Sequence, residues 1–259
     1  MTIAIVAGAS LPLAARLGLG MLGIQFAIGA VNDLADATAD AIGKPAKPIP
    51  SGRVLRREAL AVALAAAVVG CAFAASAGVG TLALGLVGLA DGLLYDLRLK
   101  RGPVAWAPFA AGVGLLPVYA WWGARGSLPV VILGVGAVAV IAGAALALAN
   151  AYADIEGDTR AGIHSLATLL GRRRTLQIDG LLTAAVQTIV AASTVAVGAV
   201  VPVWLALFCG CGLGWAGLAL AAARGDRWRP LVWEAQALGF VVAGGAWLAA
   251  LVAAGALRG

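Results

Sequence analysis

The chain has 259 residues, of which 62% are hydrophobic and only 12% charged, so it is too apolar for an ordinary soluble domain of this length. Its net charge of +6 could indicate a nucleic-acid partner in a soluble protein. Here the basic residues gather in short loops between apolar runs, which is typical of membrane topology instead. The composition therefore predicts a polytopic membrane protein with the lipid bilayer, and no nucleic acid, as its partner.

The apolar runs are much longer than strands and lack the two-residue alternation of an outer-membrane barrel, so helices are the expected spanning elements. Residues 1–10 are too few to cross a bilayer, which takes roughly 20 residues. We expect one all-α transmembrane domain over residues 1–259. Its eight complete spans are expected at residues 11–38, 58–77, 79–97, 103–123, 129–153, 174–197, 200–223 and 230–256.

The loops after the first, third, fifth and seventh spans hold 15 of the 18 Lys and Arg residues. Short loops rich in basic residues stay on the cytoplasmic side of a membrane. We therefore expect these four loops to be cytoplasmic and both termini to lie on the other side.

Residues 32–40, the first Asp-rich segment, place polar groups at the cytoplasmic end of the first span. In a helix Asn32, Asp36 and Asp40 follow the i, i+4, i+8 spacing of one face, while Asp33 turns partly aside. Carboxylates near a bilayer are costly and repel one another. This arrangement calls for a cation or a basic partner.

Residues 150–158, the second Asp-rich segment, repeat the pattern at the cytoplasmic end of the fifth span. Asn150, Asp154 and Asp158 again follow the i, i+4, i+8 spacing. Two acidic helix ends on one membrane face can share divalent ions, which prefer carboxylate and amide oxygens.

Between these segments in the sequence, residues 95–101 read YDLRLKR at another cytoplasmic helix end. Tyr95 offers a hydroxyl, and Lys100 offers a mobile charge suited to phosphate oxygens. The simpler interpretation is that Arg98, Lys100 and Arg101 anchor the helix at the membrane interface.

Carboxylates joined through Mg²⁺ and ringed by basic side chains form a typical diphosphate site. A diphosphate at the mouth of an apolar helix bundle can send a hydrocarbon tail between the helices. An isoprenyl diphosphate has both parts, and a dry cavity would shield its allylic cation from water.

These residues resemble the UbiA superfamily of intramembrane prenyltransferases. The first Asp-rich segment is similar to its NDxxDxxxD motif, and the basic stretch KPIPSG at residues 47–52 is similar to its PLPSG loop. Residues 154–158 resemble its DxxxD motif. Tyr95 and Lys100 resemble its YxxxK element, with one extra residue between them.

The resemblance implies helices ringed around a central cavity, with the first helix short or missing, and Mg²⁺ as the cofactor. It also implies the site residues: Asn32, Asp36, Asp40, Asp154 and Asp158 for the metal; Lys44, Lys47, Lys100 and Tyr95 for the diphosphate; and Asp36, Asp154, Tyr95 and Lys100 for catalysis. Asp33 matches the motif but lies off the helix face, so it ranks below Asp36.

The implied activity is transfer of a prenyl group from an isoprenyl diphosphate to an aromatic or lipid acceptor. The site would face the cytoplasm from within the cell membrane. A terpene cyclase and a transferase of phosphoribose onto a lipid carrier are alternatives of related chemistry. A non-catalytic membrane protein or a cation-coupled transporter is the alternative of a different class.

Overall fold

The computed structural model describes residues 1–160, 162–224 and 230–257, and these residues form helices and loops without any strand. The helices are α1 (Thr2–Val6), α2 (Leu11–Gly43), α3 (Arg56–Ser76), α4 (Val79–Leu94), the π-helical turn η1 (Tyr95–Leu99), α5 (Trp106–Arg125), α6 (Val130–Arg160), α7 (Leu166–Ala196), α8 (Val201–Arg224) and α9 (Pro230–Ala253). The predicted all-α class is confirmed.

Among the described residues, seven helices are long and apolar enough to cross a membrane. They are α2, α3, α4 continued by η1, α6, α7, α8 and α9. The fourth expected span, residues 103–123, corresponds to α5, which is a helix of 20 residues with Pro117 inside it but is not among the seven. Helix α1 is short, as expected, with five residues.

Both Asp-rich segments lie inside helices, because α2 and α6 run further than the apolar pattern predicts. Helix α2 continues to Gly43 and α6 to Arg160, whereas the spans were expected to end at residues 38 and 153. Helix α7 begins at Leu166, ahead of the expected start at residue 174, and is interrupted at Gly171, where φ is 73° and ψ is 166°. The apolar pattern predicts the part of each helix that suits lipid. Backbone hydrogen bonding continues the helix past the end of that pattern.

The chain divides into two compact units. The N-terminal unit consists mainly of Ile3–Lys100 and Tyr119–Ser127, and the C-terminal unit mainly of Arg101–Val118 and Leu128–Gly259. Helix α5 contributes residues to both units. The expectation of one transmembrane domain stays a prediction, and each unit is described by itself.

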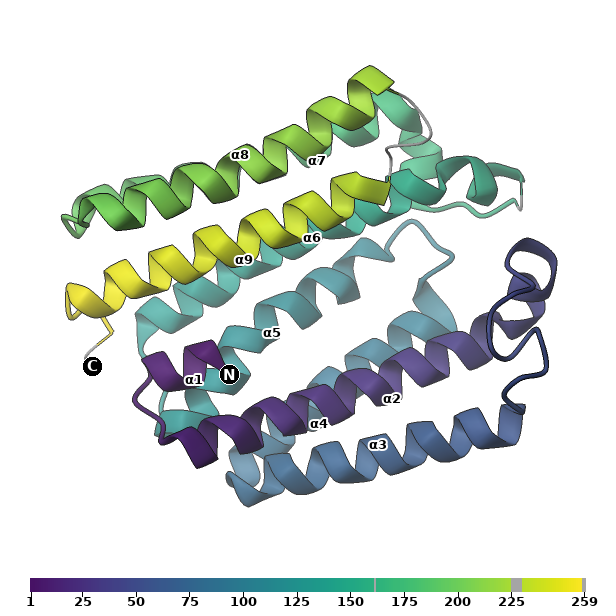
Figure 1. Cartoon of the computed structure of the whole chain (residues 1–259), viewed down its shortest axis with the longest axis horizontal. Coiled ribbons are helices and arrows are strands. Elements are labelled where there is room, and N and C mark those ends of the chain that lie inside the picture. The colour runs from purple at the N-terminus through teal and green to yellow at the C-terminus, as the bar shows by residue number, and fades with distance from the viewer. Residues whose placement is uncertain (161, 225–229, 258–259) are drawn as a thin grey trace. The chain divides into compact units, whose positions relative to one another are not determined.

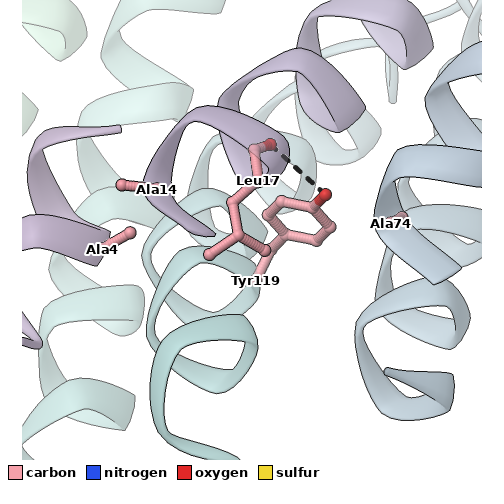
Figure 2. Packing of buried hydrophobic residues seen from close by; sticks show 5 residues of the cluster. All are labelled: Ala4, Ala14, Leu17, Ala74 and Tyr119. Atoms are coloured by element: carbon pink, nitrogen blue, oxygen red, sulfur yellow. Dashed lines mark hydrogen bonds between the residues drawn. The ribbon is translucent and has the colours of Figure 1, made fainter. Parts of the chain in front are cut away.

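In the N-terminal unit, α2 packs against α3 and α4 (Figure 1). The backbones of α2 and α3 touch at glycines: a Cβ added to Gly23 would lie 2.7 Å from Gly70 Cα. Figure 2 shows the buried cluster of Ala4, Ala14, Leu17, Ala74 and Tyr119, in which the Tyr119 hydroxyl donates to the Leu17 carbonyl at 3.4 Å. Small residues thus bring the helix that carries the first Asp-rich segment close to its neighbours.

In the C-terminal unit, α6 packs against α7 and α9, and α8 packs against α9 (Figure 1). A Cβ added to Gly210 of α8 would lie 2.6 Å from the Gly239 carbonyl oxygen of α9. A polar contact also crosses this apolar interior: the Gln236 amide of α9 donates to Asp179 Oδ1 of α7 at 2.9 Å. Both side chains are completely buried.

Candidate active site

The first Asp-rich segment lies on the last turns of α2, where its oxygen atoms divide into two pairs. Asn32 and Asp36 are one helical turn apart and both reach Lys100. Asp33 and Asp40 are seven residues apart, which is close to two full turns, and both reach Lys47. The helix thus presents two pairs of side-chain oxygen atoms, and one lysine ammonium contacts both members of each pair.

Lys47 is held by both carboxylates of its pair. Its Nζ lies 2.8 Å from Asp40 Oδ2 and 3.1 Å from Asp33 Oδ1. The Asp40 side chain is only 12% exposed, compared with 48% for Asp33, so the Asp40 contact is the better protected from solvent. The hydrogen bond to Asp40, followed by the contact with Asp33, raises the pKa of the Lys47 ammonium above its ordinary value. Lys47 therefore remains charged throughout the physiological pH range.

The loop between α2 and α3 is folded back on itself by its own hydrogen bonds. The Ser51 hydroxyl donates to the Pro48 carbonyl at 3.1 Å, and Arg53 Nε donates to the Ser51 hydroxyl at 3.0 Å. Gly52 has a φ of 74°, a conformation that favours glycine. This compact turn brings Lys47 back against the helix end it has just left.

Lys100 approaches from another part of the chain, after the π-helical turn η1. Its Nζ lies 2.7 Å from Asp36 Oδ1 and 2.9 Å from Asn32 Oδ1, although Asn32 is 68 residues away in the sequence. The side chain of Lys100 is only 13% exposed. The contact joins the end of the third span to the Asp-rich end of the first.

The π-turn accounts for the extra residue between Tyr95 and Lys100. The Lys100 amide donates to the Tyr95 carbonyl at 2.9 Å, a bond between residues five apart rather than four. A π-turn absorbs one inserted residue and leaves the following helical register almost unchanged. The longer spacing therefore still brings Lys100 to the Asp-rich face of α2.

Two residues at this site were not selected from the sequence. Asp33 was set aside on the i, i+4 pattern, although its seven-residue spacing from Asp40 could have placed both on one face. Asp96 is 4% exposed, and its Oδ2 has no hydrogen-bond partner. Asp96 is the buried residue of the π-turn, which leaves no periodic signal in the sequence.

The second Asp-rich segment lies on the last turns of α6 in the C-terminal unit. Asn150 and Asp154 are exposed, while Asp158 is half-buried one turn beyond Asp154. Between them, Glu156 forms a 3.4 Å ion pair with Arg172 of α7. Within this segment Tyr152 is buried and packs in a cluster with Ala149, Leu218, Ala221 and Val232, which holds the segment against the unit's interior.

Within residues 1–160, 162–224 and 230–257, no three His, Cys, Asp or Glu side chains are gathered as metal ligands. In the first Asp-rich segment the oxygen atoms are turned toward ammonium groups instead. Lys44 is exposed in the loop after α2 and forms none of the ion pairs found among the described residues.

Comparison with known proteins gives the chain its family. Residues 1–235 match the model of the UbiA prenyltransferase family. The digeranylgeranylglyceryl phosphate synthase of Pyrococcus abyssi is 31% identical over 185 residues, which are 68% of this chain and 65% of the relative. The synthase of the same name from Methanoregula boonei is 35% identical over 153 residues, or 57% of this chain and 53% of the relative. The matches thus span between about half and two thirds of these relatives.

Solved structures share the fold at lower identity. A UbiA homologue from Aeropyrum pernix K1 in its apo form has a TM-score of 0.77 at 21% identity, covering 94% of this chain and 92% of that one. A UbiA homologue from Archaeoglobus fulgidus bound to GPP and Mg²⁺ has a TM-score of 0.65 at 20% identity, covering 94% of both chains. With the family model matched over most of its length, the chain belongs to the UbiA prenyltransferase family.

Proposed function

We propose that the protein is an Mg²⁺-dependent membrane prenyltransferase that moves a prenyl group from an isoprenyl diphosphate to a hydrophobic acceptor. One observation carries this proposal: two ammonium groups, those of Lys47 and Lys100, each lie between two side-chain oxygens of the first Asp-rich segment. These oxygens already hold cations, and carboxylate and amide oxygens are the ligands that Mg²⁺ prefers. Family membership and the Archaeoglobus fulgidus homologue bound to GPP and Mg²⁺ support the same activity.

The roles follow from the chemistry of each side chain. The proposed metal ligands are Asn32, Asp36, Asp40, Asp154 and Asp158. When bound, Mg²⁺ neutralises the negative charge of the diphosphate and makes it a better leaving group. Lys47 and Lys100 would bind phosphate oxygens, with Lys44 as a further contact from the loop. The Tyr95 hydroxyl, which precedes Lys100 by the π-turn, would orient the reacting end of the donor.

In the proposed reaction the allylic C–O bond of the donor breaks, and its electron pair leaves with the diphosphate. The acceptor then forms a bond to the allylic carbon and releases its proton. Asp36 and Asp154 would hold the metal that stabilises the charge of the departing diphosphate. Apolar helices exclude water from the reacting carbon, so that the acceptor rather than water captures it.

The curated relatives point to the class of acceptor. Both are named digeranylgeranylglyceryl phosphate synthase, a name that contains a glyceryl phosphate carrying isoprenoid chains. We propose that this chain likewise prenylates a glyceryl phosphate lipid. Its site would lie in the cell membrane on the cytoplasmic side, where the basic loops of the sequence are expected.

The test uses the purified protein in lipid nanodiscs with GPP or a longer isoprenyl diphosphate, a glyceryl phosphate lipid and Mg²⁺. Diphosphate release is measured together with the mass of the lipid product. We expect EDTA, Asp36→Asn and Asp154→Asn each to lower the rate about a hundredfold or more, because the leaving group loses its charge stabilisation.

The matched control is Glu234→Gln, which removes an exposed acid of α9 outside both Asp-rich segments. It should leave the rate within about twofold of the unmodified protein. Unchanged diphosphate release in EDTA and in both Asp variants would overturn the proposal. A product derived from the donor alone would instead identify a cyclase.

A further inference from the structure

Two of the three lysines contact side-chain oxygen atoms of the first Asp-rich segment, including those of the proposed metal ligands Asn32, Asp36 and Asp40. Lys47 Nζ bridges Asp33 and Asp40, and Lys100 Nζ bridges Asn32 and Asp36. The third lysine, Lys44, lies in the same loop as Lys47 but is exposed and outside these contacts. The chain therefore contains its own control for the effect of lysine charge.

An ammonium group and Mg²⁺ cannot use these oxygens together. The lysine contacts are 2.7 to 3.1 Å long, whereas Mg²⁺ draws its oxygen ligands to about 2.0–2.1 Å in a strict octahedral geometry. Two cations on the same carboxylates would also repel each other. Metal binding therefore requires each ammonium to move away.

The free-energy cost of displacing a lysine ammonium depends on whether an anion is nearby. The Lys100 side chain is only 13% exposed and its ammonium donates to two oxygen atoms, so binding of metal alone would cost it both contacts. A diphosphate at the same helix end would offer replacement oxygens to the displaced lysine. Ligands that relieve each other's costs bind with positive coupling, and the coupling acts equally in both directions.

We propose that Lys47 and Lys100 are tethered cations that compete with Mg²⁺ for the first Asp-rich segment and move to the diphosphate when it arrives. This exchange rests on the proposed function, which supplies the diphosphate. The exchange makes metal binding depend on the donor. Without an isoprenyl diphosphate, the two lysines neutralise the carboxylates. When an isoprenyl diphosphate binds, the lysines move to it and leave the carboxylates available to the metal.

The first experiment measures binding of Mn²⁺, as a paramagnetic substitute for Mg²⁺, by electron paramagnetic resonance in the absence of diphosphate. Lys47→Met and Lys100→Met should each bind Mn²⁺ about three- to tenfold more tightly than the unmodified protein, because the competing cation is gone. Lys44→Met removes the same charge from the same loop without a carboxylate contact, so its affinity should stay within about twofold. Gel filtration and thermal unfolding verify that each variant is folded.

The second experiment needs no substitution that removes a charge. Reductive methylation with ¹³C-formaldehyde labels the three lysines and preserves their charge, and Lys→Arg variants assign the three side-chain signals in the NMR spectrum. Addition of Mg²⁺ should shift the signals of Lys47 and Lys100 and leave that of Lys44 in place.

The exchange would be wrong if Lys47→Met and Lys100→Met bound Mn²⁺ no more tightly than the unmodified protein. It would also be wrong if Lys44→Met tightened binding equally, or if Mg²⁺ saturated the protein without moving the two lysine signals. Prenyl turnover on the same preparation separates the two proposals. Turnover without lysine displacement overturns the exchange and leaves the proposed function, whereas lysine displacement without turnover overturns the proposed function and leaves only the competition between lysine and metal.

Discussion

At the scale of single residues, the two carboxylates that share Lys47 differ in their surroundings. Asp40 is 12% exposed and lies 2.8 Å from the ammonium, whereas Asp33 is 48% exposed and lies 3.1 Å away. Solvent screens an exposed ion pair and weakens its contribution to stability. Asp40 is therefore the main anchor of Lys47, and Asp33 adds charge at the rim.

Replacing each carboxylate by its amide tests this ranking. Asp40→Asn should lower the free energy of unfolding by about 1 kcal/mol, and Asp33→Asn by less than about 0.5 kcal/mol. Thermal unfolding in detergent measures both. Because the pKa of Lys47 is raised from 10.5, the difference should persist below pH 10.5 and disappear as pH rises through the raised value. Equal effects of the two variants would contradict the ranking.

At the scale of elements, the π-turn η1 determines whether Lys100, at the end of the third span, points toward the Asp-rich end of α2. The turn holds one residue more than an α-helical turn and ends where Lys100 meets α2. Its central residue Leu97 is 58% exposed, so the insertion can be removed without opening a buried cavity.

Deletion of Leu97 should convert η1 into an ordinary α-helical turn and keep Lys100 against Asp36, because a π-turn is an insertion into an α-helix. Metal-dependent turnover should stay within about threefold of the unmodified protein. Insertion of one Ala after Leu97 instead rotates Lys100 by about 100° and should lower turnover about a hundredfold. Equal losses from deletion and insertion would show that the π-turn itself is required.

The buried contact between α7 and α9 provides a second test at this scale. Asp179 Oδ2 and Gln236 Oε1 both lack hydrogen-bond partners, although Gln236 Nε2 reaches Asp179 Oδ1 at 2.9 Å and Thr183 Oγ1 at 3.2 Å. An amide at position 179 would replace the unpartnered Asp179 Oδ2 by an NH2 group, which could donate to Gln236 Oε1.

Asp179→Asn should therefore keep or raise the unfolding temperature. Asp179→Leu should lower the free energy of unfolding by about 1–2 kcal/mol, because it removes one of the two acceptors of the buried Gln236 amide. Thermal unfolding of the two variants side by side makes the comparison. An Asn variant as unstable as the Leu variant would contradict the argument.

At the scale of the whole molecule, the basic residues near the two ends of α2 bear on which end of this helix faces the cytoplasm. The loop of Lys44 and Lys47 follows the Asp-rich end of α2. At the opposite end of that helix, Arg125 lies against Gly8 in the same N-terminal unit. These two ends of the unit should face opposite sides of the membrane.

Single cysteines in a variant whose three native cysteines are replaced by alanine test this orientation. Ala46→Cys, in the basic loop, should react with a membrane-impermeant maleimide only after the cells are opened. Ser127→Cys, in the loop after α5, should react in intact cells. Both positions are exposed, so accessibility to water is matched. The reverse labelling pattern would contradict cytoplasmic placement of the first Asp-rich segment.

The sequence by itself determined seven of the eight expected membrane-spanning helices, all but α5, and the positions of both Asp-rich segments. Long apolar runs leave helices as the available spanning structure, and polar residues four apart share one face of such a helix. Those properties are local, so they can be read along the chain. The ends of α2 and α6 were placed too early, because hydrogen bonding continues beyond the apolar pattern.

Only the tertiary structure decided which oxygen atoms each lysine meets. Lys47 returns to Asp33 and Asp40 because the loop after α2 folds back, and Lys100 reaches Asn32 across 68 residues after a π-turn. Neither path has a period that the sequence displays. A periodic pattern fixes the face of one helix, whereas the pairing of charges depends on where separate helices and loops bring their side chains together.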